Sequence, residues 1–246
     1  MEVHAHTHTP RKKWTHYFWE FLMLFLAVFC GFLAEYYLEH KIEHSREKQF
    51  IKAFVNDIKS DTAQLSSIKV FRLARLNNMD SIILFFAGNS SSTIPLSIHR
   101  RMEQLKGYAS FYQSSGTLDQ LKNSGGLRLI RRRIVVDSIQ AYDQQIKRMV
   151  LRDQWEAEEM RYTYRLGYQL VDGKQITKIH ADTTYFNKIV LPGSGTLALN
   201  TQYLSEYLSS LATFRLVVNS DLLLQANIKK KGVDLLRLIK KEYNLE

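Results

Sequence analysis

Residues 40–44 match the H-x-x-E-H pattern of inverted zinc peptidases. On a helix, His40 and His44 lie one turn apart and can share a metal, with Glu43 beside them as a base for the bound water. The flanking Glu39 and Glu47 place the pattern on a charged helix, and no third ligand can be assigned. We therefore favour an incidental match and keep a zinc peptidase as a second alternative.

A second group of possible metal ligands lies in the N-terminal tail, where His4, His6 and His8 alternate with other residues. Short His-rich tracts bind zinc, nickel or copper, but only an extended chain puts all three imidazoles on one side. We interpret residues 1–13 as a disordered cytoplasmic tail with weak metal affinity, and we expect no cofactor.

The sequence contains no Ser/His/Asp set, no phosphate-binding loop and no pair of cysteines, since Cys30 is the only cysteine. The glycines between Gly116 and Gly126 lack the spacing of a phosphate loop. These observations favour a protein that is not an enzyme.

Residues 14–38 predict a transmembrane helix. Between Tyr17 and Leu38 the only charged residues are Glu20 and Glu35, and the apolar stretch between them suits a hydrocarbon core of about 30 Å. Aromatic residues flank both ends, as at membrane interfaces; they are Trp14, Tyr17, Trp19, Tyr36 and Tyr37. The lipid bilayer is therefore the first expected partner.

A cleaved signal peptide is the alternative interpretation of this segment. Cleavage after Ala34 or Gly31 would leave Phe32 or Phe29 at a position that requires a small residue. We therefore expect the helix to be retained.

Basic residues predict the orientation of the helix. Arg11, Lys12 and Lys13 stand directly before it, which places the N-terminus in the cytoplasm by the positive-inside rule. The rest of the chain is then extracytoplasmic.

One stripe of the predicted membrane helix carries small residues and a carboxylate: Glu20, Ala27, Gly31 and Ala34. Such a stripe lets a second helix approach closely, and a carboxylate at membrane depth is costly without a partner or water. Self-association explains the stripe, and contact of Glu20 with the nearby interface is the equal alternative.

Residues 39–246 predict one mainly helical, bundle-like domain without disulfides, because the whole chain has only 3 Pro and 11 Gly. Residues 39–66 continue the membrane helix as one rod, and a small β-hairpin is possible around Asp172-Gly173. Further helices are expected over residues 67–87, 95–112, 118–123, 130–166, 201–218 and 220–243. The core positions expected in the longest of these include Ile139, Ile146 and Trp155.

The net charge of +10 raises the question of nucleic acid. The basic run at residues 128–133 lacks interleaved aromatics or a recognition motif, so a solvated face near anionic headgroups is favoured and nucleic acid is not expected.

Several features together resemble a group of uncharacterised single-pass membrane proteins common in Bacteroidota. They are the N-terminal span, the Glu- and Arg-rich helix over residues 39–61, the stretch Thr117-Leu118-Asp119-Gln120-Leu121-Lys122-Asn123-Ser124-Gly125, and Leu127-Arg128-Leu129-Ile130. The resemblance covers about residues 18–165. It implies a bacterial inner-membrane location, and it carries no known activity or functional residue.

The sequence therefore predicts a membrane-anchored binding or assembly protein of the bacterial envelope, acting as a homo-oligomer or with a membrane-protein partner. A sensor-type ligand-binding helical bundle is the leading alternative.

Overall fold

The structure, a computed structural model, describes residues 13–89, 92–175, 177 and 195–245. The chain divides into two units, Met1–Phe50 and Ile51–Glu246. Helix α1, Trp14–Gly88, extends through both units. It is unbroken because no proline and only one internal glycine, Gly31, occur between its ends. The His-rich tail lies outside the described residues.

In the first unit, the apolar side chains of α1 have no protein around them. Phe21, Met23 and Leu24 are 65–72% exposed, and the most apolar window has a mean hydropathy of 2.0 with none of it buried. Among the described residues, α1 is the one helix that is long enough and apolar enough to cross a membrane.

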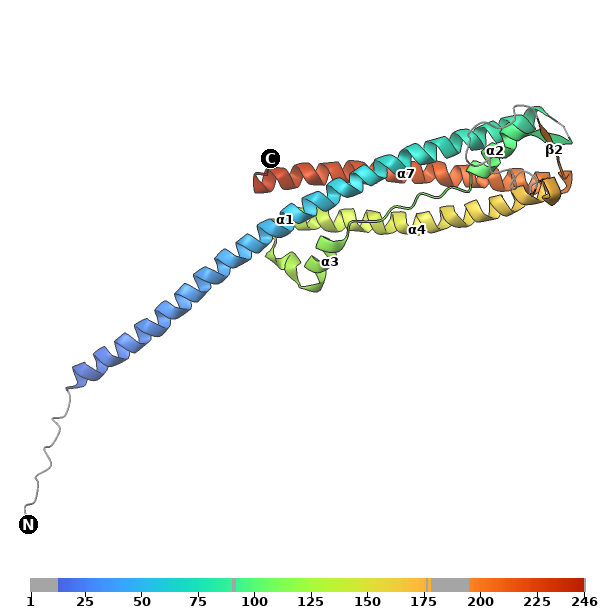
Figure 1. Cartoon of the computed structure of the whole chain (residues 1–246). Coiled ribbons are helices and arrows are strands. Elements are labelled where there is room, and N and C mark those ends of the chain that lie inside the picture. Colours follow the sequence, from blue (N-terminus) through green and yellow to red (C-terminus); the bar gives the residue numbers. More distant parts are fainter. Residues whose placement is uncertain (1–12, 90–91, 176, 178–194, 246) are drawn as a thin grey trace, which may run out of the picture. The chain divides into compact units, whose positions relative to one another are not determined.

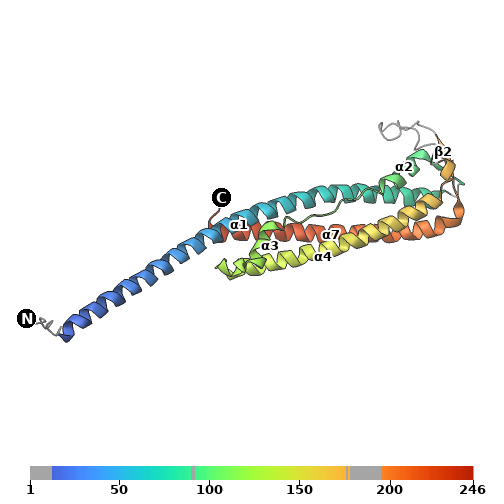
Figure 2. The ribbon, with the colours of Figure 1, turned by 60° about the horizontal axis from the view of Figure 1, so that its bottom comes forward.

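The second unit is a bundle of three long helical segments: residues 51–88 of α1, helix α4 (Arg133–Gln169) and helix α7 (Leu204–Tyr243). Figures 1 and 2 both show the three segments side by side, with α7 antiparallel to α1. Gly232 of α7 permits a close approach, because a Cβ there would lie 2.9 Å from the Thr62 methyl group of α1. Ile58, Leu65, Ile139, Ile146, Phe214 and Ile228 are fully buried in this bundle.

Short elements cover one end and one side of the bundle. Strand β1 (Thr93–Pro95) pairs antiparallel with β2 (Thr196–Ala198), Ile94 opposite Leu197. Helix α2 (Leu96–Gln104) follows β1, while α3 (Gly116–Asn123) and the 3-10 turn Gly126–Leu129 precede α4. A second 3-10 turn, Thr201–Tyr203, leads into α7.

The mainly helical fold is confirmed, and so is a small antiparallel sheet, but its position differs from the expected hairpin. Asp172 and Gly173 do not join two strands; the Asp172 side chain accepts a hydrogen bond from Lys174 N at 3.0 Å and starts a helical turn. The strands that pair are instead separated by about a hundred residues of chain.

The expected helix boundaries also change. Residues 201–243 form one long helix after a short turn, because buried positions continue through Val218, Asp221 and Gln225 without a break at Ser220. The predicted helix over residues 95–112 ends at Gln104 instead.

The chain between α2 and α3 runs in extended form along α1 and α4 (Figure 1). Its backbone amides donate to carboxylates of both helices: Ser114 N to Asp61 Oδ1 at 2.8 Å and Phe111 N to Asp153 Oδ2 at 3.1 Å. This connector therefore covers the groove between α1 and α4.

Candidate functional site

The H-x-x-E-H residues lie on α1 within the first unit, and their side chains bind neighbouring residues. His40 Nε2 is 2.8 Å from Tyr36 Oη, and its Nδ1 lies 3.5 Å from Glu43. His44 Nδ1 lies 3.3 Å from Glu47. In the described part of the chain, no group of three or more His, Cys, Asp or Glu side chains is placed to hold a metal ion. His4, His6 and His8 lie outside it.

The stripe of Glu20, Ala27, Gly31 and Ala34 is exposed along its length. Glu20 forms an ion pair with His16 at 3.1 Å when that imidazole is protonated. A Cβ built at Gly31 would meet no atom within 4 Å, so one copy of the chain leaves this position open.

The bundle contains a layer of buried charges that the sequence analysis did not identify. Arg72 and Arg75 of α1 are 1% and 2% exposed. Arg72 donates to Asp153 Oδ1 at 2.6 Å and to Glu156 Oε2 at 2.8 Å, and Arg75 also donates to Glu156. Two guanidinium groups and two carboxylates thus balance in charge inside the bundle.

Neutral groups add hydrogen bonds to this layer, although Arg75 Nε has no partner among the described residues. The Gln225 side chain of α7 accepts from Arg72 at 3.0 Å and donates to the Leu65 carbonyl oxygen. Arg75 donates to the Gly107 carbonyl oxygen of the connector and lies over the Phe71 and Phe214 rings, 4.7 and 5.3 Å from their centroids. All three helices and the connector are therefore joined at one level.

The pKa shifts in the layer run in different directions, since burial lowers the pKa of Arg75 although Glu156 acts against this. Burial lowers the pKa of Arg72, and the charges and hydrogen bonds of Glu156 and Asp153 outweigh this, so its pKa is raised. Burial raises the pKa of Asp153, while Arg72 and the Phe111 amide act against that shift. Since donors reach both oxygens of Asp153, we assign it as a carboxylate at neutral pH.

A second buried ion pair lies beside the layer. Arg152 of α4 donates to Asp221 Oδ1 of α7 at 2.7 Å, and the other oxygen of Asp221 has no hydrogen-bond partner among the described residues. Burial raises the pKa of Asp221 to about 6, although Arg152 lowers it. This carboxylate therefore takes up a proton in mildly acidic solution.

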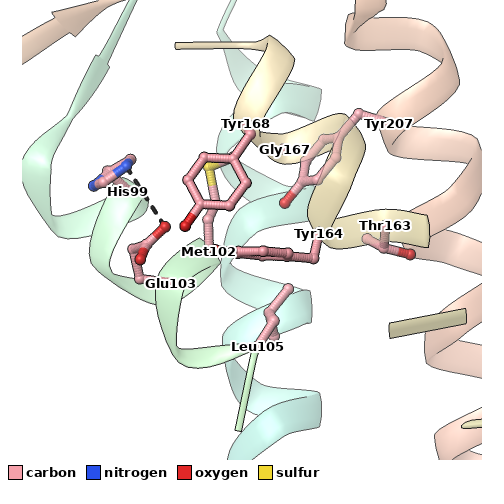
Figure 3. Close-up of a pocket in the computed structure, with 9 residues that line it drawn as sticks. All are labelled: His99, Met102, Glu103, Leu105, Thr163, Tyr164, Gly167, Tyr168 and Tyr207. Atoms are coloured by element: carbon pink, nitrogen blue, oxygen red, sulfur yellow. Dashed lines mark ion pairs between the residues drawn. The ribbon is translucent and has the colours of Figure 1, made fainter. Parts of the chain in front are cut away.

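A small cavity lies nearer the strand end of the bundle, between α2, α4 and α7 (Figure 3). Its lining includes His99, Met102 and Glu103 from α2, and Tyr164, Tyr168 and Tyr207 from α4 and α7. Its volume of about 10 Å³ is close to the minimum for one water molecule and far below the hundreds of Å³ that organic ligands occupy.

Polar groups converge on this cavity. The Tyr207 hydroxyl points toward Tyr164 and Tyr168 (Figure 3), it is buried, and it has no hydrogen-bond partner among the described residues. Burial raises the pKa of Tyr207, so the hydroxyl stays protonated and serves as a donor. The Lys106 ammonium group lies 4.4 and 4.6 Å from the Tyr164 and Tyr168 ring centroids.

The layer carries a sequence signal that spacing alone could have revealed. The buried positions Ile68, Arg72, Arg75, Met79 and Ile82 are separated by four, three, four and three residues, as core positions of a coiled coil are. Asp153 and Glu156 in α4, and Asp221 and Gln225 in α7, occupy equivalent consecutive core positions. Polar residues at core spacing on three helices at once indicate a buried polar layer.

No family model, no curated protein and no solved structure matches this chain. The geometry of the described residues is therefore the basis for assigning a function.

Proposed function

We propose that this protein is a non-enzymatic assembly protein, anchored by its N-terminal helix in the inner membrane of a bacterium. In this proposal residues 14–38 span the membrane, the N-terminus is cytoplasmic, and the three-helix bundle lies in the periplasm. There it forms homo-oligomers or recruits a membrane-protein partner.

The observation that carries the proposal is the exposure of the apolar residues of α1 in the first unit. Burying each large apolar side chain is worth about 1.5–3 kcal/mol, and a run as long as residues 17–38 cannot remain in water without aggregation or cover. A bilayer provides that cover along the full length of the run.

The bundle supports a binding role rather than a catalytic one. Its buried Arg72 pairs with Asp153 and Glu156 across two helices, and the cavity beside Tyr207 is too small for an organic substrate. Charged groups arranged in this way commonly select one alignment of helices over others. A bundle with a single alignment is suited to presenting a defined surface.

Labelling with a membrane-impermeant maleimide tests the topology. With Cys30→Ser as background, Ala63→Cys places a thiol on an exposed position of the bundle, and Ala5→Cys places one in the tail. We expect label at residue 63 in intact spheroplasts and at residue 5 only after lysis. The reverse pattern would overturn the proposed orientation.

Chemical crosslinking in native membranes tests assembly through the anchor. Gly31→Leu fills a position that is open in a single copy, so it should weaken the crosslinked oligomer without disturbing the monomer. Phe29→Leu, on the opposite side of the helix, is the matched control. A monomer that neither change affects would reject assembly through this stripe.

The cavity with its unpartnered Tyr207 hydroxyl favours the sensor-type alternative. Ligand binding there would require the tyrosines of α4 to move apart. A low-molecular-weight extract of the envelope should then raise the melting temperature of the full chain, and Gly167→Leu, which would crowd the Tyr207 ring, should abolish the rise.

The peptidase alternative has a separate test. Stoichiometric zinc in the purified chain, together with hydrolysis lost in Glu43→Gln, would replace the assembly proposal. We expect neither.

A further inference from the structure

Residues 70–88 of α1 and 209–227 of α7 expose little charge, and their partly exposed charged side chains, Asp80 and Arg215, pair with each other. Every other exposed residue from Val70 to Gly88 of α1, and from Ser209 to Asn227 of α7, is uncharged. Several are large and apolar: Val70, Leu84, Leu216 and Leu223 are 66–72% exposed. Such a run is unusual in a chain of net charge +10, and it indicates a surface kept free of unpaired charge.

The outward face of α4 is different. Its exposed residues between 147 and 165 include five charged side chains, namely Lys147, Arg148, Glu158, Arg161 and Arg165. The groove between α1 and α4 is covered by the connector, and Arg152 and Asp221 pair between α4 and α7. The side formed by residues 70–88 of α1 and 209–227 of α7 is uncovered in the described bundle, and Asp80 and Arg215 neutralise each other there.

The spacing along α7 matches a helix-pairing seam. Exposed residues 212, 216, 219, 223 and 226 are separated by four, three, four and three positions, which is the heptad pattern. Asn219 stands at the centre of this seam, a leucine lies on each side of it, and an alanine lies at each end. An asparagine at such a position selects one register, because it requires a polar partner in the facing helix.

The same level of α1 carries matching residues. Arg215 of α7 pairs with Asp80 of α1 at the outer edge of their contact, where each side chain is about 40% exposed. Because the helices are antiparallel, Asn77 lies at the level of Asn219, and Leu73 lies at the level of Leu223. The two helices thus present one surface, polar at its centre and apolar toward both ends. We name it the neutral face: Val70, Leu73, Leu84, Leu216, Asn219 and Leu223.

We propose that the neutral face binds the neutral face of a second copy of this chain. A surface with apolar ends and an amide at its centre is complementary to itself under a two-fold rotation, as symmetric dimers require. An anionic membrane or an acidic polymer would select unpaired cations, whereas Arg215 at the edge of this face is paired with Asp80. The inference rests on the proposed function, because a few apolar side chains hold two copies together only when tethering in one membrane raises their effective concentration.

Disulfide trapping in native membranes tests the contact with the full chain. In the Cys30→Ser background, Asn219→Cys should give a disulfide-linked dimer on mild oxidation, since Asn219 meets its own counterpart. Gln154→Cys, exposed on the charged face of α4, is the matched control. We expect at least tenfold more dimer from residue 219, and equal yields would overturn the inference.

Two further positions give the direction of the paired helices. If the two α7 helices are parallel, Ala212→Cys forms a disulfide with the same residue of the second copy, and so does Ala226→Cys. If they are antiparallel, a disulfide forms between residue 212 of one copy and residue 226 of the other when both variants are co-expressed. Either pattern supports the dimer. Absence of every one of these links, including the link at residue 219, would overturn it.

A charge placed on the neutral face should separate the copies. Leu223→Glu is expected to lower the residue-219 disulfide at least tenfold, while Leu151→Glu, 61% exposed on α4, should leave it unchanged. Both leucines face solvent in one copy, so the two melting temperatures should stay equal. An unchanged yield of the residue-219 disulfide in Leu223→Glu would show that the copies do not meet at the neutral face. The crosslinking test with Gly31→Leu is separate, because it reports on assembly through the anchor.

Discussion

The two parts of α1 differ in which side chains they expose. Residues 14–38 expose nearly every apolar side chain, including Phe25 and Phe29. Residues 51–88 bury one apolar stripe, with Ile58 and Leu65 at 0% exposed, and they also bury Arg72 and Arg75. One continuous helix thus exposes apolar side chains in residues 14–38 and buries two arginines in residues 51–88.

This difference shows that the surroundings, and not helix propensity, set the pattern of each part. In the bundle, α4 and α7 cover the apolar stripe and supply carboxylates for the arginines. In the first unit no described residue covers the apolar side chains, and in the proposed arrangement they lie in lipid. The predictions that follow change one part at a time.

The largest expected effect comes from removing a buried charge. Arg72→Met leaves Asp153 and Glu156 with Arg75 as their only buried cation, which should lower the free energy of unfolding by about 3–5 kcal/mol. Lys69→Met, exposed on the same helix, is the control and should change it by less than about 0.5 kcal/mol. Urea unfolding in detergent micelles measures both, and equal values would show that the layer does not stabilise the bundle.

The membrane part should respond to an added charge instead. Ala27→Arg places a cation near the middle of the apolar segment at a cost of about 2.5–3.5 kcal/mol, so the equilibrium between inserted and extracted chain should shift about a hundredfold toward extraction. Ala63→Arg, on an exposed position of the bundle part of α1, should have no effect on extraction. If Ala27→Arg stays in the membrane pellet, the segment does not span the bilayer.

The pH dependence of unfolding should report on Asp221. Its pKa is near 3.8 in the unfolded chain and about 6 in the bundle, where burial outweighs Arg152 of α4 and Arg72 of α1, and Glu156 of α4 adds to the rise. The folded state therefore binds more protons between pH 4 and 6, and stability falls as pH rises through this window, by less than about 1.4 kcal/mol per pH unit.

Asp221→Asn should remove this part of the slope. The difference between the natural chain and the variant isolates it, because burial also raises the pKa of Asp61 and Asp153, which contribute slopes of the same sign. Parallel unfolding curves for the two chains from pH 4 to 7 would show that Asp221 titrates normally.

The smallest effect concerns hydroxyl groups near the cavity. Tyr207→Phe removes a buried hydroxyl without a described partner, so the free energy of unfolding should stay the same or rise by up to about 1 kcal/mol. The Thr163 hydroxyl lies 2.6 Å from the Ser210 hydroxyl. Ser210→Ala removes this partner, so it should lower the free energy of unfolding by about 1–3 kcal/mol. A clear loss of stability in Tyr207→Phe would reveal a bound water or ligand in the cavity.

Several sequence predictions failed where contacts distant in the chain decide the structure. The helix expected to break near Ser220 continues, because its buried face keeps packing against α1 and α4. Trp155, expected in the core, is 60% exposed with the Arg152 guanidinium 5.6 Å from its ring centroid. The β-pairing joins residues 93–95 to residues 196–198, which no local turn signal can indicate.

The sequence by itself determined the long apolar segment and the mainly helical character, because length, hydrophobicity and the scarcity of Pro and Gly act locally along the chain. Only the tertiary structure decided which charged residues are buried. Arg72, Asp153 and Gln225 meet because three helices align at one level, and that alignment depends on packing between segments far apart in sequence.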